Sequence, residues 1–222
     1  METSIGAITL IETLIVPVLT NYPLLYRMLK SIDYPIENIV IINNGDGIIN
    51  LPDMSGNVHL IDLPHNIGVA ASWNLGIKVT PLSRNWLIVN FDVEFPEMAL
   101  DKLARHANDK KIVFADCWPE WACFIVGWQV IEKIGFFDEN CHPVYCDDDV
   151  ATFRARAKGI EMEKTAIRVR HDNSSSIKDP IYAEQNARTF DFNVAYAKKV
   201  IESGDPEPVP LQLSRLRNQA WI

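Results

Sequence analysis

Short apolar runs alternate with amphipathic segments along the first half of this chain. The runs at residues 13–19, 38–42 and 58–63 are rich in Val, Ile and Leu and have the length of strands. Between the first two, residues 22–32 carry Leu25, Leu29 and Ile32 at helical spacing. This alternation is typical of βαβ units, so it predicts a mainly parallel sheet.

The same pattern continues to residue 115 and then weakens. It predicts helices over residues 68–79, 97–107, 147–159 and 181–202, and strands over 86–91, 111–115 and 161–170, with a short apolar stretch at 123–126. A chain of 222 residues with 48% hydrophobic residues suffices for one large core but not comfortably for two. We therefore expect an α/β fold of Rossmann-like type, with a mixed, mainly parallel sheet flanked by helices in a single domain, residues 1–222.

The net charge, the apolar runs and the cysteine spacing argue against several classes of protein. The formal net charge of −8 argues against binding to nucleic acid through phosphate contacts, which needs clustered Lys and Arg. No apolar run approaches the ~20 residues of a membrane-spanning helix. The start of the chain lacks the basic region of a secretion signal, and the spacing of Cys117, Cys123, Cys141 and Cys146 does not favour a zinc site. We expect reduced thiols in a cytoplasmic protein.

Polar residues follow the predicted strand at residues 86–91. Alternate side chains of a strand point the same way, so Asn90, Asp92 and Glu94 are expected to converge on one hard cation. Strand ends of open α/β sheets are where ligands bind. The alternative is a strand terminus with a turn-favouring Asp.

Three consecutive carboxylates begin the predicted helix at residue 147. Capping explains one of them and the helix dipole another, but three adjacent like charges need a further reason. Burial would raise the pKa of one member towards that of a general base. We assign this role to Asp148, with Asp147 as the helix cap and Asp149 beside them.

Other candidate features more often have a structural explanation than a functional one. His171 ends a predicted strand before a Ser-rich loop and is a possible ligand of the same metal or of a diphosphate, although a lone His is more often structural. Gly68, Ser72 and Gly76 share one helical face, which allows either a close ligand or tight packing on the sheet. The aromatic faces of Trp118, Trp121 and Trp128 suit sugar rings or a core.

Taken in order, these segments resemble a known family. The pieces TLIVPVLTN, IVIINNGDG, HNIGVAASWNLGI, VNFDVEFP, IEKIGFFDENCHPVYCDDDVATFRARAKG and RVRHDNSSS, within residues 10–176, resemble inverting family-2 glycosyltransferases of the GT-A fold, and in particular their rhamnosyltransferase-like branch. The series is specific, whereas no single piece is.

The resemblance implies roles for individual residues. The nucleotide would lie over the carboxyl ends of the first strands. The residues implied for donor binding are Pro17, Val18, Asn43, Asn66, Gly68, Asn74 and Asn90. Asp92 and His171 would hold Mn²⁺ or Mg²⁺, and Asp148 would be the catalytic base, with Asp147, Asp149 and Glu94 as possible supporting residues. Asn43 stands where the family usually has an acidic residue, so the nucleotide stays open.

The implied activity is transfer of a sugar from a UDP-, dTDP- or GDP-sugar to an acceptor hydroxyl with inversion. Residues 10–115 would form the nucleotide-binding half, 116–180 the acceptor side, and 181–222 a C-terminal helix and tail. A glycan, a lipid-linked sugar, a protein or a modified nucleobase remains open as acceptor. The Leu and Trp content of residues 211–222 suggests packing on a second subunit.

Two other functions remain open. A non-catalytic sugar-nucleotide or glycan-binding protein of the same fold fits the presence of Asn43, Asn90 and Val150 where acids are expected. A nucleotidyltransferase fits the fold, but it would need a basic, Gly-rich phosphate loop, and LIVPVLTNYP has neither Gly nor Lys.

Overall fold

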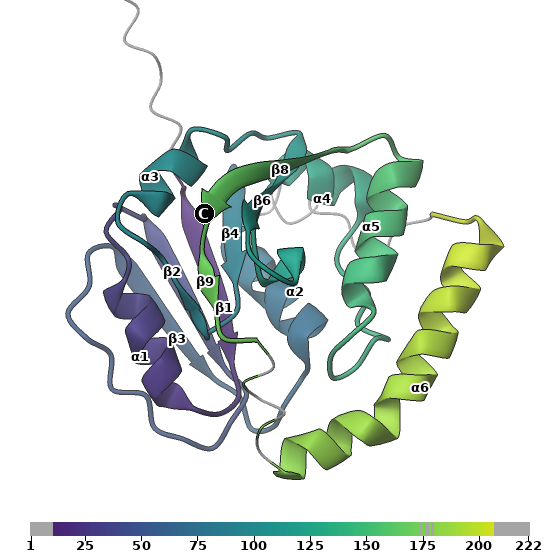
Figure 1. The fold of residues 1–222 in the computed structure, drawn as a ribbon, viewed down its shortest axis with the longest axis horizontal. Helices are drawn as coiled ribbons and strands as arrows, with labels where there is room; N and C mark the ends of the chain where they lie inside the picture. The colour runs from purple at the N-terminus through teal and green to yellow at the C-terminus, as the bar shows by residue number, and fades with distance from the viewer. Residues whose placement is uncertain (1–10, 174, 176–177, 179, 207–222) are drawn as a thin grey trace, which may run out of the picture.

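A seven-stranded sheet forms the centre of the molecule (Figure 1). The computed structural model describes residues 11–173, 175, 178 and 180–206. Within them the strand order is β3-β2-β1-β4-β7-β6-β8. The strands are β1 (Thr13–Val18), β2 (Asn38–Asn43), β3 (Asn57–Asp62), β4 (Asn85–Val89), β6 (Lys111–Asp116), β7 (Cys123–Gly127) and β8 (Glu161–Arg168). Only β7 runs against the others, so the predicted mixed, mainly parallel sheet is confirmed.

Helices cover both faces of the sheet. On one face α1 (Tyr22–Lys30) and α3 (Ala99–Ala104) pack on the core cluster that contains Leu14, Val16 and Val18 of β1. On the other face α2 (Val69–Val79), α4 (Trp128–Ile134) and α5 (Asp147–Ala157) pack on the cluster that contains Ile15. Neighbouring residues of β1 thus enter different cores, which explains why this strand is an uninterrupted apolar run.

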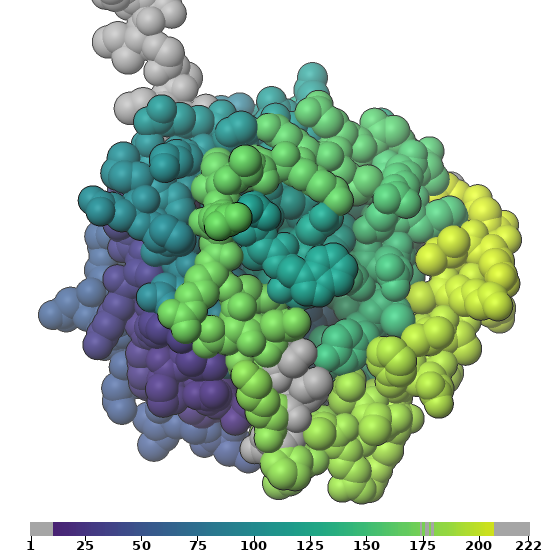
Figure 2. Space-filling view, in the orientation of Figure 1, coloured from purple at the N-terminus to yellow at the C-terminus, as the bar shows by residue number. Residues whose placement is uncertain are grey.

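Three smaller elements complete the fold. The 3₁₀ turn η1 (Glu120–Ala122) precedes β7, and a two-stranded sheet pairs β5 (Val93–Glu94) with β9 (Arg170–His171) in antiparallel fashion. The long helix α6 (Pro180–Ser203) packs beside α5 through Ala197 and Val200. Figure 2 shows the green β8 and β9 segment crossing the face of the molecule between the purple α1 side and the yellow α6.

Most predicted elements are found, with differences at their ends. β4 stops at Val89, earlier than predicted, because a turn closed by a bond from Val93 N to Asn90 O follows it. The strand predicted over residues 161–170 is divided: β8 ends at Arg168, Val169 N bonds to Asp116 O, and β9 pairs with β5 instead. The helix α4 and the antiparallel direction of β7 were not predicted.

The structure also bears on the membrane and cysteine expectations. Within the described residues, no helix combines the length and the apolar character that a membrane crossing requires. All four cysteines are free. The tail at residues 211–222, for which packing on a second subunit was suggested, lies outside the described residues.

Candidate active site

A cleft opens at the carboxyl ends of β1 and β4. Its walls come from parts of the chain that are far apart in sequence, and it brings together most of the predicted site residues. Predicted residues in its lining are Pro17, Val18, Asn66, Gly68, Asn90, Asp92, Asp147, Asp148 and His171. Ligand sites of open α/β sheets lie at this edge, so the position agrees with the expectation from the strand ends.

Asp92 and His171 form the centre of this cleft. Oδ1 of Asp92 lies 3.0 Å from Nε2 of His171, and the two side chains are only 4% and 3% exposed. The turn after β4 presents Asp92, and β9 presents His171, since Val93 of β5 pairs directly with His171. Nδ2 of Asn90 lies 3.3 Å from the same Nε2. The small sheet therefore joins two site residues that are distant in sequence.

Hydrogen bonding fixes the charge and orientation of this pair. Burial alone raises the pKa of Asp92, but its hydrogen bond and charge interaction with His171 outweigh burial and lower the pKa. Burial alone lowers the pKa of His171, but Asp92 and the carbonyl of Trp118, which lies 2.8 Å from Nδ1, raise it overall. The Nδ1 contact with a carbonyl leaves Nε2 as the ring nitrogen that faces Asp92.

The donor set of this pair fits a divalent cation. The described residues contain no group of three or more His, Cys, Asp or Glu side chains arranged around one point. A carboxylate oxygen and an imidazole nitrogen nevertheless meet at the cleft, together with the amide of Asn90. Mg²⁺ or Mn²⁺ in phosphate chemistry commonly takes one or two protein ligands and fills its shell with phosphate oxygens and water. The predicted ligands Asp92 and His171 are thus adjacent.

Glu94 does not join this group as predicted. The turn at residues 90–93 interrupts the strand, so the alternation that would have aligned Glu94 with Asp92 is lost. Glu94 is instead paired with Arg27 at 3.3 Å and with Arg170 at 3.1 Å. Its carboxylate therefore links α1 to β9.

The acidic run at the start of α5 supplies a second polar wall. Asp147 is 3% exposed, and burial, followed by repulsion from Asp148, raises its pKa to about 7. Burial and the neighbouring Asp149 also raise the pKa of Asp148, which is half-buried in the cleft. Asp149 is exposed. Desolvation and like charges thus act on two of the three carboxyls.

The predicted cap of this helix is corrected. Cys146 occupies the N-cap position with a left-handed backbone, φ 71°, and Asp147 is already the first helical residue. The side chain of Cys146 makes no capping hydrogen bond, and the first-turn N–H of Asp149 donates to Oδ1 of Asp148 at 3.0 Å. Asp147 is buried inside the first turn, one residue past the N-cap position that was predicted for it.

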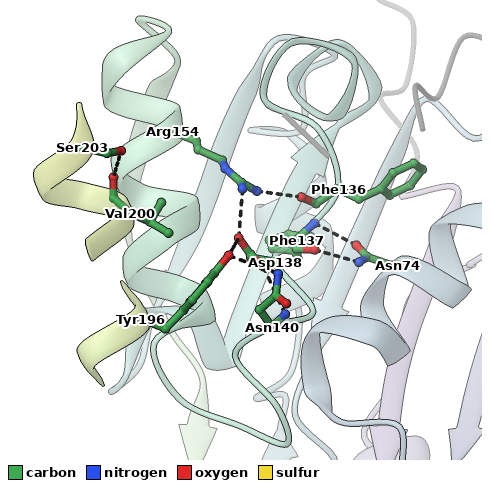
Figure 3. A network of polar contacts seen from close by, with 9 residues as sticks. All are labelled: Asn74, Phe136, Phe137, Asp138, Asn140, Arg154, Tyr196, Val200 and Ser203. Carbon is green, nitrogen blue, oxygen red and sulfur yellow. Dashed lines mark hydrogen bonds and ion pairs between the residues drawn. The ribbon is translucent and has the colours of Figure 1, made fainter. Parts of the chain in front are cut away.

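A polar network holds the segment that leads into α5 (Figure 3). Arg154 donates to the carbonyl of Phe136 at 3.2 Å and to Asp138 at 3.0 Å, and both bonds are buried. Tyr196 of α6 donates to the same Asp138 at 3.1 Å. Asn193 of α6 also donates to the carbonyl of Val144 at 2.9 Å. The loop before the acidic run is therefore fixed from both α5 and α6.

Asn74 belongs to this network and not to the donor site for which it was predicted. Its side chain is fully buried and exchanges two hydrogen bonds with the backbone of Phe137, each 2.9 Å long (Figure 3). It also donates to Glu139 at 2.8 Å. These bonds occupy the amide, so Asn74 acts as a bridge between α2 and the loop after α4.

The side-chain amide of Asn43 is likewise occupied by hydrogen bonds within the protein. It is 2% exposed, accepts a bond from Tyr22 at 3.0 Å and donates to Asp62 at 2.8 Å, which corrects its predicted donor contact. The next residue, Asn44, lines the cleft instead and is bonded to Ser72 at 2.9 Å and to Ile67 N at 3.0 Å. The run NNGDG contains both, but only the register of β2 decides which one faces the cleft.

The glycine-rich helix face combines both of its expected roles. Gly68 lines the cleft with φ 86°, and a Cβ there would lie 2.8 Å from Nδ1 of His142 and from the carbonyl of Pro143. Asn66 Oδ1 accepts a bond from Gly68 N at 2.8 Å. Gly76 faces the sheet, where a Cβ would lie 2.6 Å from Cγ2 of Ile15. The first glycine shapes the cleft and the second allows tight helix packing.

Of the three tryptophans considered for sugar rings, Trp121 lines the cleft, and it is joined there by residues that were not predicted. Trp121 and Trp73 line the cleft as part of an aromatic cluster with Phe124 and Phe137, whereas Trp118 is 76% exposed and Trp128 packs on the core. Other lining residues that the sequence did not indicate include Leu19, Val69, Phe91, Pro119, Ala122, Tyr145, Tyr182, Gln185 and Asn186. The last three belong to α6, whose sequence shows only a helical period.

Solved glycosyltransferases share this fold. The mannosyltransferase PcManGT from Pyrobaculum calidifontis, in complex with GDP-Man and Mn²⁺, matches with a TM-score of 0.53 and 15% identity, over 70% of this chain and 54% of its own. TarS from S. aureus, residues 1–349 with UDP, matches with a TM-score of 0.54 and 12% identity, over 72% and 59%. The same protein with UDP-GlcNAc gives 0.53 and 12%, over 72% and 57%.

The other comparisons found no match, and the low sequence identity restricts the likeness to the fold. No protein-family model matches the sequence, and no curated protein matches it. The chain spans 54% to 59% of the length of the solved structures named above. At 12% to 15% identity the likeness concerns the fold. The chain therefore has a GT-A-like fold, the fold of these glycosyltransferases.

Proposed function

We propose that this protein is a metal-assisted glycosyltransferase that moves a sugar from a nucleoside diphosphate sugar to an acceptor hydroxyl with inversion. One observation carries the proposal: a single cleft holds both the Asp92–His171 pair and the acidic start of α5. Solved structures of similar fold hold GDP-Man with Mn²⁺, UDP or UDP-GlcNAc, which supports this class of donor. The transfer needs both a site for the diphosphate and a base, and the cleft offers one of each.

The donor nucleotide is proposed to lie over the ends of β1 and β2. Pro17 and Val18 offer an apolar surface for the base, and Asn44 and Asn66 border it. Residues 10–115 would then form the nucleotide-binding half, and residues 116–180 with α6 the acceptor side. A UDP-, GDP- or dTDP-sugar is compatible with this surface.

Asp92 and His171 are the residues that would hold Mn²⁺ or Mg²⁺. When bound, such an ion neutralises charge on the diphosphate leaving group. Asp92 brings a carboxylate whose pKa is lowered, so it is ionised at neutral pH. His171 is oriented by the carbonyl of Trp118. Asn90 borders the pair and would contact the phosphates or the sugar.

Asp148 is the proposed base. It is half-buried in the cleft, whereas Asp147 is almost fully buried, so Asp148 is the better placed of the two to reach an acceptor that enters from solvent. Its carboxylate takes the proton from the acceptor hydroxyl as the oxygen bonds to the anomeric carbon. The bond from that carbon to the diphosphate oxygen breaks on the opposite face, and the diphosphate leaves with the electron pair. The raised pKa of Asp148 makes it a stronger base than an exposed Asp.

Binding of donors tests the proposal directly. We would measure the thermal stability of the protein with UDP-glucose, UDP-GlcNAc, GDP-mannose and dTDP-glucose, each with and without Mn²⁺. A ligand at about 100 times its Kd stabilises the folded state by about 2.7 kcal/mol. We expect Mn²⁺-dependent stabilisation by at least one donor, lost in Asp92→Asn and kept in Asp53→Asn, which alters an exposed carboxylate outside the cleft.

Other outcomes separate the competing functions. Donor binding without release of nucleoside diphosphate, with any of the glycans, lipid-linked sugars or proteins offered, would identify a non-catalytic binding protein. Formation of pyrophosphate from a nucleoside triphosphate and a sugar phosphate would identify a nucleotidyltransferase. Absence of any stabilisation across the panel would contradict the proposed function.

A further inference from the structure

A tryptophan that lines the cleft has a buried N–H group for which the described residues offer no acceptor. Trp73 of α2 lines the cleft and is 3% exposed, and among the described residues its Nε1 has no hydrogen-bond partner. Indole nitrogen is a donor only, and buried Trp N–H groups usually find a partner. Leaving such a donor unpaired costs free energy, so an unpaired one in a native structure requires an explanation.

The neighbours of Trp73 hold its ring in place but do not accept a hydrogen bond from its N–H group. Its ring packs edge-on against Phe124 and Phe137, with centroids 5.3 Å and 5.0 Å away. Neither ring offers a conventional acceptor. Asn74, the next residue, fixes the backbone of Phe137 through two hydrogen bonds. The indole therefore keeps its orientation before any ligand arrives, which is the property of a preorganised binding group.

The position of Trp73 favours the donor sugar over the acceptor. Trp73 belongs to α2, which packs against β1 and β2, the strands whose ends carry the proposed nucleotide surface. Trp73 is 3% exposed, so it belongs to the buried side of the lining. The side chains that α6 contributes, Tyr182, Gln185 and Asn186, are half-buried or exposed and form the more open side. In the proposed function the donor sugar would lie against this buried side, and the acceptor would enter from the open side.

We propose that the indole N–H of Trp73 donates a hydrogen bond to a hydroxyl oxygen of the donor sugar and so selects the sugar. This inference rests on the proposed function and assigns one residue to the recognition of the donor. A sugar hydroxyl accepts such a bond while keeping its own proton for another acceptor. A donor that lacks a hydroxyl at this point would leave the indole unpaired, so Trp73 would discriminate against it.

The test compares nucleotide sugars with the matching nucleoside diphosphates. Kd is measured by calorimetry in Mn²⁺ for UDP-glucose and UDP, GDP-mannose and GDP, and dTDP-glucose and dTDP, with wild type and Trp73→Phe. Phe keeps an aromatic ring but removes the N–H. For the sugar that the wild type prefers, we expect Trp73→Phe to raise Kd about three- to tenfold, the effect of one neutral hydrogen bond. The Kd of the nucleoside diphosphate should not change.

Two further variants make the comparison specific. Trp86→Phe removes a buried indole N–H that donates to Thr80 at 3.0 Å outside the cleft, and it should leave both Kd values unchanged. If Trp73→Phe also weakens the nucleoside diphosphate, the smaller ring has disturbed the cleft. Trp73 is then replaced by 3-benzothienylalanine, whose ring has nearly the same shape but carries sulfur in place of N–H. This variant shows whether the N–H group itself is needed for binding of the sugar.

The outcomes distinguish this inference from the proposed function. Wild-type binding of a nucleotide sugar with equal affinity in Trp73→Phe or in the sulfur isostere would overturn the role of Trp73 and leave the function standing. Failure of the wild type to bind any nucleotide sugar or nucleoside diphosphate would overturn both. Selective loss of affinity for the nucleotide sugar would support the inference.

Discussion

Arg154 lies 3.0 Å from Asp138, and both side chains are buried, with 8% and 4% exposed. Asp138 also accepts the bond from Tyr196 of α6, so one carboxylate joins α5, the loop after α4 and α6. The acidic residues at the start of α5 follow this loop directly. Their position in the cleft therefore depends on a pair that lies outside it.

Removal of Asp138 is expected to destabilise the protein strongly. Asp138→Ala leaves the charge of Arg154 buried and unpaired, which typically costs about 3–5 kcal/mol. The free energy of unfolding would be measured in urea. The control is Asp101→Ala, because its partner Arg105 is 72% exposed and surface pairs contribute about 1 kcal/mol or less. Equal losses in the two variants would contradict a special role for the buried pair.

The stability of the protein should fall as pH rises from about 4 to about 7, in part because of Asp147. Burial and the carboxylates of Asp148, Asp149 and Asp138 raise its pKa to about 7 in the folded state, whereas the unfolded chain ionises near 4. Between these values the folded protein binds one more proton, so its stability decreases with a slope of about 1.4 kcal/mol per pH unit from this group.

Asp147→Asn should remove this slope. Urea unfolding at pH 5, 6, 7 and 8 would show the variant gaining stability relative to wild type as pH rises, with no further change above about pH 8. Asp149→Asn is the matched control, because Asp149 is an exposed neighbour in the same run. A stability difference between wild type and Asp147→Asn that is constant with pH would disprove the raised pKa.

Asp148→Asn should abolish most of the turnover while leaving donor binding intact. General base catalysis commonly contributes a factor of about 10² to 10⁴. Slow release of nucleoside diphosphate from the bound donor, with water in place of the acceptor, gives an assay that needs no acceptor. Asp149→Asn should retain nearly the wild-type rate. A wild-type rate in Asp148→Asn would transfer the role of base to another residue, with Asp147 the next to test.

Gly76→Ala should weaken the packing of α2 on the sheet. The new Cβ would lie 2.6 Å from Cγ2, 2.7 Å from Cδ1 and 2.8 Å from Cγ1 of Ile15, which is fully buried. Overpacking of this kind costs about 1–3 kcal/mol. Ile15→Ala removes all three of these carbons, so Gly76→Ala combined with Ile15→Ala should lose less than the sum of the single losses in urea unfolding. Simple additivity would mean that Ile15 is not the obstacle.

The sequence predicted the framework because local patterns determine it. Apolar runs of strand length and helices with one apolar face fixed the order of the elements and the mixed sheet, and their ends differ by a few residues. Asp92 and His171 were both expected at strand ends, where the structure has them. Each of these expectations used residues that are close in sequence.

The errors arose where contacts between distant segments decide the outcome. Glu94 was expected beside Asp92, but the turn after Val89 ends the strand and leaves Glu94 to Arg27. The family resemblance assigned Asn74 to the donor, but its amide is occupied by the loop at Phe137, which is far along the chain and which no local pattern links to it. Asp147, rather than Asp148, is the most buried carboxylate of the run. This difference depends on how the preceding loop packs, which no local pattern encodes.

The pairing of β5 with β9 also sets an order of events during synthesis. The chain leaves the ribosome from its N-terminus, and β8 is complete at Arg168, three residues before His171. Every strand of the main sheet, the acidic run of α5 and Asp92 have thus been made before the histidine that completes the pair. An ion held by both Asp92 and His171, as proposed, could therefore bind only after every strand of the main sheet has been synthesised.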